Sequence, residues 1–221
     1  MVDHVIWDWN GTLLDDGHAV LDALNRLLRE LGRAPTDLAT YRSLYRRPVR
    51  RFYELLLDEP IDDQRWDRID RGFHEAYAVE VGRVRLHGQA RVALGRVAEA
   101  GRSQSLLSMA PHDHLVTMVA RHDLDHHFDR VDGVRGVGGG HKEHVLRDHL
   151  AALGVERTDR VVLIGDALDD AAAAAAVGAH AVLYDGGSHP VEDLRAVGVP
   201  VAGSLLEAID LVDTGATSPV R

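Results

Sequence analysis

The sequence predicts an α/β fold: a doubly wound parallel sheet covered by helices on both faces, with a helical domain inserted near its N-terminus. Two patterns indicate it. Short apolar runs alternate with helical segments, and the clearest run, Val161–Ile164, has no polar face, which is typical of strands buried on both sides. From Ala19 to about Val84 the pattern stays helical. We therefore expect an α/β core of residues 1–15 and 87–221 and a helical domain of residues 16–86.

The N-terminal elements follow from apolar spacing and turn residues. His4–Trp7 is a short apolar run that ends at a turn over Asp8–Gly11, so it predicts a buried strand. Leucines three and four residues apart predict an amphipathic helix that stops before Gly32. Helices in this region are expected at Ala19–Leu31, Val49–Leu57 and Asp62–Val81. Trp66, Phe73 and Tyr77 recur at helical spacing, and we expect them to form the core of the helical domain rather than a stacking platform for a ligand.

The remainder of the chain alternates between the two types of element. Strands are expected at Ser105–Ser108, Val161–Ile164, Ala179–Tyr184 and Val199–Ala202. Helices are expected at Gln89–Ala100, His112–Arg121, His141–Leu153, Asp170–Val177, Val191–Val197 and Leu205–Val212.

Composition excludes several classes of function. The chain has no cysteine, which removes thiol catalysis, thiolate metal sites and disulfides. Acidic residues number 35 against 25 basic ones, and the net charge of −10 argues against a general affinity for nucleic acids. No apolar run is long enough for a membrane span and no signal-peptide pattern occurs, so we expect a cytoplasmic protein without a membrane partner, as a monomer or homodimer.

Polar residues follow three of the predicted strands. Asp8 ends the first strand, Ser108 ends the second, and Asp166, Asp169 and Asp170 follow Ile164. Carboxyl ends of parallel strands form the edge where doubly wound sheets bind ligands, so these side chains predict a site there. Lys142, the sole lysine of the chain, lies at the start of a predicted helix just before the third of these strands. Asp169 either joins this site or caps the alanine-rich helix that follows it.

These motifs resemble those of the haloacid dehalogenase superfamily of hydrolases. The matching residues, in the same order along the chain, are Asp8–Leu14 (DWNGTLL), Ser108, Lys142 and Gly165–Asp170 (GDALDD). The helical domain between the first two motifs resembles the small cap of phosphoglycolate-phosphatase-like members. The resemblance implies a Rossmann-like core with a helical cap, and hydrolysis of a small phosphorylated metabolite.

The resemblance also assigns roles. Asp8 would attack phosphorus and form an aspartyl-phosphate, which divides a difficult hydrolysis into two steps. Mg²⁺ would lie between the Asp8 carboxylate, the backbone carbonyl of Asn10, Asp166 and Asp170, and hard oxygen ligands suit this ion. The phosphoryl oxygens would be bound by Ser108 and the backbone N–H of Met109. Lys142 would neutralise Asp8 and the phosphate.

Asn10 departs from the phosphatase pattern, which has an Asp there that protonates the leaving oxygen and then activates water. An Asn side chain cannot exchange a proton. Four explanations stay open: an activated substrate such as an acyl phosphate, a substitute acid, phosphate binding without turnover in a regulatory module, and deamidation of Asn10–Gly11. The substitute could be a histidine, and the candidates near a motif are His112, His114, Asp15 and Asp16.

Two related activities also lack that Asp. Phosphonoacetaldehyde hydrolases need a cap lysine, but residues 16–86 contain none. Haloacid dehalogenases usually have an aromatic residue where Asn10 stands, and they do not need Asp166 and Asp170. Arg46, Arg47, Arg50 and Arg51 lie in the cap, where they either recognise a second anionic group of the substrate or form a solvated basic face.

Overall fold

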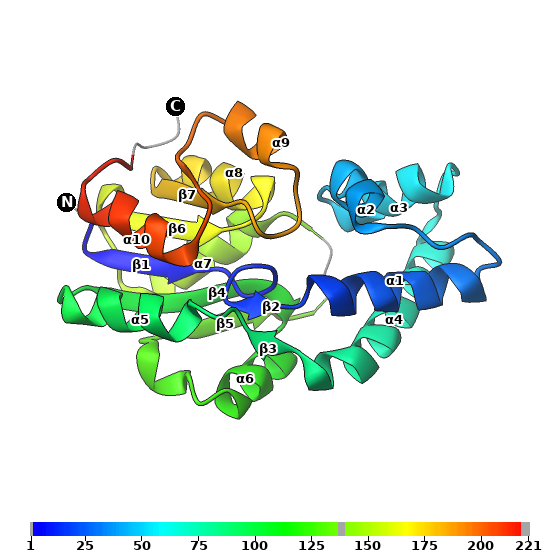
Figure 1. The fold of residues 1–221 in the computed structure, drawn as a ribbon, viewed down its shortest axis with the longest axis horizontal. Helices are drawn as coiled ribbons and strands as arrows, with labels where there is room; N and C mark the ends of the chain where they lie inside the picture. The colour runs from blue at the N-terminus through cyan, green and yellow to red at the C-terminus, as the bar shows by residue number, and fades with distance from the viewer. Residues whose placement is uncertain (1, 137–139, 218–221) are drawn as a thin grey trace.

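The computed structural model describes residues 2–136 and 140–217, in which an α/β core adjoins a group of four helices (Figure 1). The core sheet has the strand order β5-β4-β1-β6-β7-β8, and all neighbouring strands are parallel. Its strands are β1 (His4–Trp7), β4 (Ser103–Pro111), β5 (Val131–Val134), β6 (Val161–Gly165), β7 (His180–Tyr184) and β8 (Val201–Ala202).

Strand register brings the polar residues together. Trp7 pairs with Leu106 of β4 and with Ile164 of β6. Because these strands are parallel, the residues that follow each pair emerge at the same edge of the sheet. Asp8, Ser108 and Asp166 therefore lie at one edge, with β1 in the middle.

Two layers of helices cover the sheet. Alternate residues of β1 face opposite layers: Val5 and Trp7 pack on one face and Ile6 on the other. The first layer contains α5 (Ala90–Glu99), α6 (His112–Arg121) and α10 (Leu205–Asp213). The second contains α7 (Lys142–Leu153), α8 (Leu168–Val177) and α9 (Val191–Ala196). Short 3₁₀ turns, η1 (Val81–Arg83), η2 (Asp125–His127) and η3 (Thr158–Arg160), complete the connections.

The helical insertion, a term used here for α1–α4, has a hydrophobic core of its own, to which Leu24, Phe52 and Ile69 contribute. Its helices are α1 (Gly17–Glu30), α2 (Leu38–Leu44), α3 (Val49–Leu57) and α4 (Asp63–Glu80). The two chain segments that join it to the core pair with each other. These are the two-residue strands β2 (Leu14–Asp15) and β3 (Arg85–Leu86), which form an antiparallel ladder.

The predicted fold class is confirmed, and the predicted strands and helices occur with small shifts at their ends. The sequence reading omitted β5, because Val131–Val134 contains an Asp and a Gly and lacks a clear strand pattern. It also omitted α2, which Asp37 caps by accepting a hydrogen bond from Thr40 N. No strand was predicted at Leu14–Asp15 or Arg85–Leu86, where β2 and β3 lie on either side of the helical pattern. Within the described residues, no helix combines the length and the apolar character needed to cross a membrane.

Candidate active site

Three carboxylates meet at the carboxyl edge of the sheet. Asp8 follows β1, Asp166 follows β6, and Asp170 lies in the first turn of α8. One oxygen of each lies within 4.8 Å of one oxygen of the others, and all three residues are buried. The sequence-predicted metal ligands therefore converge, although they come from positions up to 162 residues apart (170 minus 8).

Lys142 completes this cluster from the start of α7. Its Nζ lies 2.5 Å from Asp8 Oδ1 and 2.6 Å from Asp170 Oδ1, and the residue is only 2% exposed. The two carboxylates raise the pKa of Lys142 against the effect of burial, so its ammonium stays charged. Burial and the neighbouring Asp170 and Asp166 raise the pKa of Asp8, while Lys142 opposes them.

The charges of the cluster do not balance. Three carboxylates face one ammonium, so these four residues carry an excess of two negative charges when all are ionised. A buried charge is costly unless an opposite charge compensates it. Burial, with a contribution from Asp170, raises the pKa of Asp166 to about 6. A divalent cation with oxygen ligands would supply the missing charge, so the residues present fit the metal that the sequence motifs imply.

Two of these carboxylates lie directly against the backbone of a glycine, which restricts their position. A methyl group at Gly165 would overlap the Asp170 carboxylate, and one at Gly187 would overlap that of Asp166. Asp166 Oδ2 also accepts a 2.6 Å hydrogen bond from Ser188 N. The loop after β7, which no sequence motif identified, thus holds Asp166 in place.

Asn10 belongs to a separate polar network beside the three carboxylates. Its Nδ2 donates to Asp16 Oδ2 at 2.7 Å and to the Tyr77 hydroxyl at 3.0 Å, and its Oδ1 accepts from Ser108 Oγ at 3.3 Å. The Tyr77 hydroxyl also donates to Asp16 Oδ2 at 2.7 Å. The Tyr77 ring packs with the hydrophobic core of the α/β domain, not with that of the helical insertion, and its hydroxyl joins this network; both facts correct the sequence expectation. Burial raises the pKa of Asp16 in spite of these donors.

The same network bears on deamidation of Asn10. That reaction needs the backbone nitrogen of Gly11 to attack the Asn10 carboxamide. Gly11 N donates instead to Asp16 Oδ1 at 2.8 Å and to Leu14 O at 3.0 Å. The hydrogen bonds oppose the loss of the Gly11 proton, so the fold protects Asn10.

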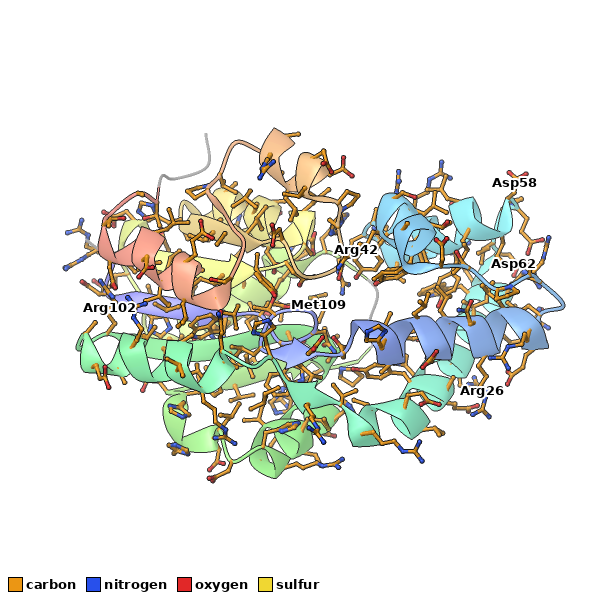
Figure 2. The ribbon with its side chains drawn as sticks, in the orientation of Figure 1. Arg26, Arg42, Asp58, Asp62, Arg102 and Met109 are labelled. Carbon is orange, nitrogen blue, oxygen red and sulfur yellow. The ribbon has the colours of Figure 1, made fainter. Side chains whose placement is uncertain are left out.

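A cavity of about 540 Å³ lies between the core and the helical insertion, and the carboxylate cluster is part of its wall. From the core, its lining includes Asp8, Asn10, Asp16, Ser108, Met109, Lys142, Asp166 and Asp170. Figure 2 shows Met109 and Arg42 at this junction, whereas Arg26, Asp58 and Asp62 lie on the far side of the insertion. The residues that the motifs assign to catalysis, phosphate binding and metal binding therefore all border one space.

Of the four arginines singled out in the cap, one is placed to recognise an anionic group of the substrate, and the other three are not. Arg47 lines the cavity, its Nε lies 3.7 Å from Asp169 Oδ2, and Arg42, which the sequence reading did not single out, joins it from α2. Arg50 pairs instead with Asp63 at 2.7 Å, away from the cavity. Arg51 pairs with Glu54, and Arg46 donates to backbone carbonyls of its own segment.

Of the four residues proposed to replace the missing acid, three lie at the cavity and one does not. Asp16 contacts Asn10, and both Asp15 and His114 line the cavity. His112 is instead engaged with Gly133 N at 3.2 Å and with Arg135. Asp169 is not the cap of the alanine-rich helix; Asp170 accepts the N–H of Ala167 there, while Asp169 accepts that of Lys142 in another helix.

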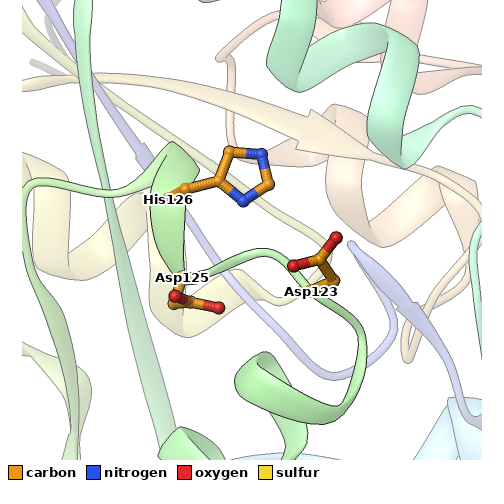
Figure 3. Close-up of side chains that lie close together, drawn as sticks. All are labelled: Asp123, Asp125 and His126. Atoms are coloured by element: carbon orange, nitrogen blue, oxygen red, sulfur yellow. The ribbon is translucent and has the colours of Figure 1, made fainter.

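A second group of possible ligands lies outside the cavity. Asp123, Asp125 and His126 lie close together after α6 and are exposed to solvent (Figure 3). Exposed acidic residues gather in this way without a ligand, and nothing else in the described structure points to one at this place.

The sequence model of a family of hydrolases, the haloacid dehalogenase-like hydrolases, matches residues 2–178. The chain belongs to this family. The resemblance seen in its motifs is thereby confirmed, and the chain is classed with hydrolytic enzymes. Curated protein sequences gave no significant match.

Solved structures share the fold of this hydrolase. A haloacid dehalogenase-like family hydrolase from Streptococcus pneumoniae aligns with a TM-score of 0.82 at 18% identity, covering 96% of this chain and 98% of the other. A predicted phosphatase from Clostridium acetobutylicum gives 0.85 at 17% identity, with coverages of 96% and 98%. CbbY from Rhodobacter sphaeroides, as an Asp-to-Asn mutant in complex with xylulose-1,5-bisphosphate, gives 0.71 at 18% identity, with coverages of 93% and 95%.

Proposed function

We propose that this hydrolase is a Mg²⁺-dependent phosphatase that acts on a small phosphorylated metabolite through a covalent intermediate at Asp8. One observation carries the proposal: a buried, negatively charged cluster of Asp8, Asp166 and Asp170, joined to Lys142, forms part of the wall of a cavity large enough for a small metabolite. Core residues 1–15 and 87–221 would supply the nucleophile, the metal ligands and the phosphate-binding groups, and residues 16–86 would form the cap that recognises the substrate.

Mg²⁺ would be held by the carboxylates of Asp8, Asp166 and Asp170 and by the backbone carbonyl of Asn10. When bound, the ion offsets charge on the phosphoryl oxygens. A carboxylate oxygen of Asp8 attacks phosphorus, the bond from phosphorus to the leaving oxygen breaks, and that oxygen takes up a proton. Water then attacks the phosphorus of the aspartyl-phosphate, which releases inorganic phosphate and restores the Asp8 carboxylate.

The other residues stabilise and orient the group that is transferred. The Lys142 ammonium neutralises Asp8 and the phosphoryl oxygens, and its two carboxylate partners keep it charged. Ser108 and Met109 line the cavity, and the Ser108 hydroxyl and the Met109 backbone N–H would donate to the phosphoryl oxygens. Asn10 holds its amide toward Asp16 and Ser108 and supplies no proton.

Asp16 is our candidate for the group that exchanges the proton in place of Asn10. It is the one of the four sequence candidates whose carboxylate contacts the Asn10 side chain in the described structure, and it also lines the cavity. General acid–base help is worth about 10²–10⁴-fold, so a carboxylate displaced from its usual position would give a slower enzyme rather than an inactive one.

Two arginines from the cap suggest the class of substrate. Arg42 and Arg47 line the same cavity as Lys142, and guanidinium groups bind carboxylates and phosphates through paired hydrogen bonds. We therefore propose a substrate with a second anionic group beyond the phosphate that is cleaved. CbbY, whose fold is shared, was crystallised with a bisphosphate, which supports a ligand of this type.

Phosphate release from a panel of phosphorylated metabolites, with and without Mg²⁺, tests this function. The panel should pair each monoanionic compound with a partner that carries a second phosphate or carboxylate. We expect release that needs Mg²⁺, favours the partners and disappears in Asp8→Asn. Asp159→Asn, which alters an exposed carboxylate paired with Arg157, is the matched control and should retain full activity.

The alternative is a protein that binds phosphate, or a partner, without turnover. Asn10 favours it, because its amide cannot supply the proton that an alkoxide leaving group needs. Binding of inorganic phosphate by the wild type, without phosphate release from any alkyl, aryl or acyl phosphate, would support this alternative and exclude the phosphatase. Release from acyl or aryl phosphates alone would instead indicate a hydrolase of activated phosphates.

A further inference from the structure

Helix α7 begins at Lys142, and it has no capping side chain of its own. His141 occupies the N-cap position without donating or accepting a cap hydrogen bond there. The first N–H groups of a helix lack partners inside the helix, so a helix that starts in a buried place needs an acceptor from elsewhere. This start matters because Lys142 reaches from it into the carboxylate cluster.

Asp169 supplies that acceptor from a different helix. It lies in the first turn of α8, and its Oδ2 accepts a 2.7 Å hydrogen bond from Lys142 N. Its Oδ1 lies 3.1 Å from Nδ1 of His141. A carboxylate at a helix N-terminus is also favoured by the helix dipole. Asp169 thus binds the two residues that set where α7 begins.

Lys142 is consequently held at both ends. Asp169 fixes its backbone nitrogen, while Asp8 and Asp170 fix its Nζ at 2.5 and 2.6 Å. A lysine side chain has four rotatable bonds, and its ammonium keeps one position only if its backbone is equally well placed. Asp169 also lines the cavity, but its hydrogen bond with Lys142 is to the backbone nitrogen, so it acts on the position of the Nζ through the backbone.

Arg47 connects this arrangement to the cap. Its Nε lies 3.7 Å from Asp169 Oδ2, and its Nη1 donates to Gly140 O at 3.1 Å, two residues before Lys142. The side chains of Arg47 and Asp169 are only 15% and 11% exposed, so this pair is largely shielded from solvent. One cap residue therefore contacts both the acceptor of the Lys142 N–H and the segment that leads into α7.

We propose that Asp169 is the positioning residue for Lys142, and that Arg47 makes this positioning depend on a docked cap. The expected effect of this positioning on catalysis rests on the proposed function. Removing the carboxylate would let the start of α7 shift, and a displacement of about 1 Å at a catalytic group can cost about 10²-fold in rate. We expect Asp169→Ala to lower kcat about 10–100-fold, with a smaller change in KM. Asp169→Asn keeps an oxygen acceptor for Lys142 N and should recover part of kcat.

The sole lysine of the chain gives a direct test that needs no activity. Labelling with ¹⁵N-lysine yields one backbone amide signal and one Nζ signal in NMR spectra. In the wild type we expect slow hydrogen exchange of the Lys142 amide and a Nζ signal protected from solvent. Asp169→Ala should speed amide exchange and move both signals, Asp169→Asn should move them less, and Arg47→Gln should shift them in the same direction. Asp159→Asn alters an exposed carboxylate paired with Arg157 and serves as the control, with both signals unchanged.

Two outcomes would overturn the inference. One is fast exchange of the Lys142 amide in the wild type, a measurement that holds even if a variant fails to fold. The other is a folded Asp169→Ala protein whose two lysine signals match those of the wild type. Neither depends on turnover, so both remain distinct from failure of the proposed function, which would appear as no phosphate release by the wild type.

Discussion

Moving the carboxylate between positions 10 and 16 tests whether the missing proton donor limits this enzyme. Asn10 Nδ2 lies 2.7 Å from Asp16 Oδ2, so amide and carboxylate form one hydrogen-bonded pair. Three variants explore it: Asn10→Asp, Asp16→Asn and the swap that carries both changes. The swap keeps one amide and one carboxylate in contact, whereas Asn10→Asp places two carboxylates there.

The separation of the pair sets the size of the effect. Two negative charges 2.7 Å apart repel by about 6 kcal/mol at an effective dielectric constant of 20, before the side chains relax. That energy corresponds to about four pKa units, so the pair in Asn10→Asp should retain one proton at neutral pH. A protonated carboxyl group would then lie where the leaving oxygen needs it. We expect kcat on alkyl phosphates to rise about 10–10³-fold, with a smaller gain on aryl phosphates.

Steady-state kinetics on one alkyl and one aryl phosphate, with thermal denaturation of each variant, measure this. Asn10→Asp should melt below the wild type because its two buried carboxylates must take up a proton to avoid repulsion, and the swap should recover that loss while keeping the gain in rate. Asp16→Asn alone should slow alkyl phosphates if Asp16 exchanges the proton. Intact-mass and peptide analysis must accompany the kinetics, since deamidated wild type would already carry the carboxylate at position 10.

Equal rates on an alkyl phosphate for the wild type and all three variants would refute the reasoning. They would show that neither position carries the proton. His114, which also lines the cavity, would then be the next residue to replace.

Three further predictions follow from described contacts. Lys142→Met should abolish activity and Lys142→Arg should lose most of it, because a guanidinium does not reproduce a point charge bound between Asp8 and Asp170; intact turnover in Lys142→Met would contradict the assignment. Gly187→Ala should weaken Mg²⁺ binding about 10–100-fold by displacing the carboxylate beside it, measured as the Mg²⁺ concentration for half-maximal activity. His4 is buried, and its pKa falls from 6.5 to about 4, mainly through burial, so the unfolded chain takes up its proton first as the pH falls. Folding should therefore lose up to about 3 kcal/mol between pH 6.5 and 4 at this residue, and urea denaturation of His4→Gln should show a flatter pH dependence than the wild type.

The sequence predicted the central part of the site because parallel strands deliver their ends to one edge. Asp8 and Asp166 each follow a short apolar run, and this local pattern needs no knowledge of the tertiary fold. The order of motifs then placed Ser108 and Lys142 beside them. Their roles remain predictions, although the structure brings all of these residues together.

The contacts that the sequence could not predict join elements that are distant along the chain. Tyr77 occupies a helical position that reads as core, and its hydroxyl meets Asp16 only because α4 packs along α1. Asp169 has the spacing of a cap for its own helix, yet it caps α7. Neither residue carries a local signal of its partner, since helical spacing and capping preference describe a single segment at a time.

The β2–β3 ladder has a consequence for engineering. Leu14 pairs with Leu86 and Asp15 with Arg85, so the chain leaves the core and returns to it at neighbouring points. A segment whose ends meet in this way, and which has a hydrophobic core of its own, can be exchanged as a cassette without changing the distance that the host chain must bridge. Grafting a cap from another protein between positions 16 and 85 would retain the carboxylate cluster and Asp16, and would discard Arg42, Arg47 and Tyr77 together. Such chimeras would show which substrate preferences come from the cap, and whether the chemistry of the core survives the loss of Arg47.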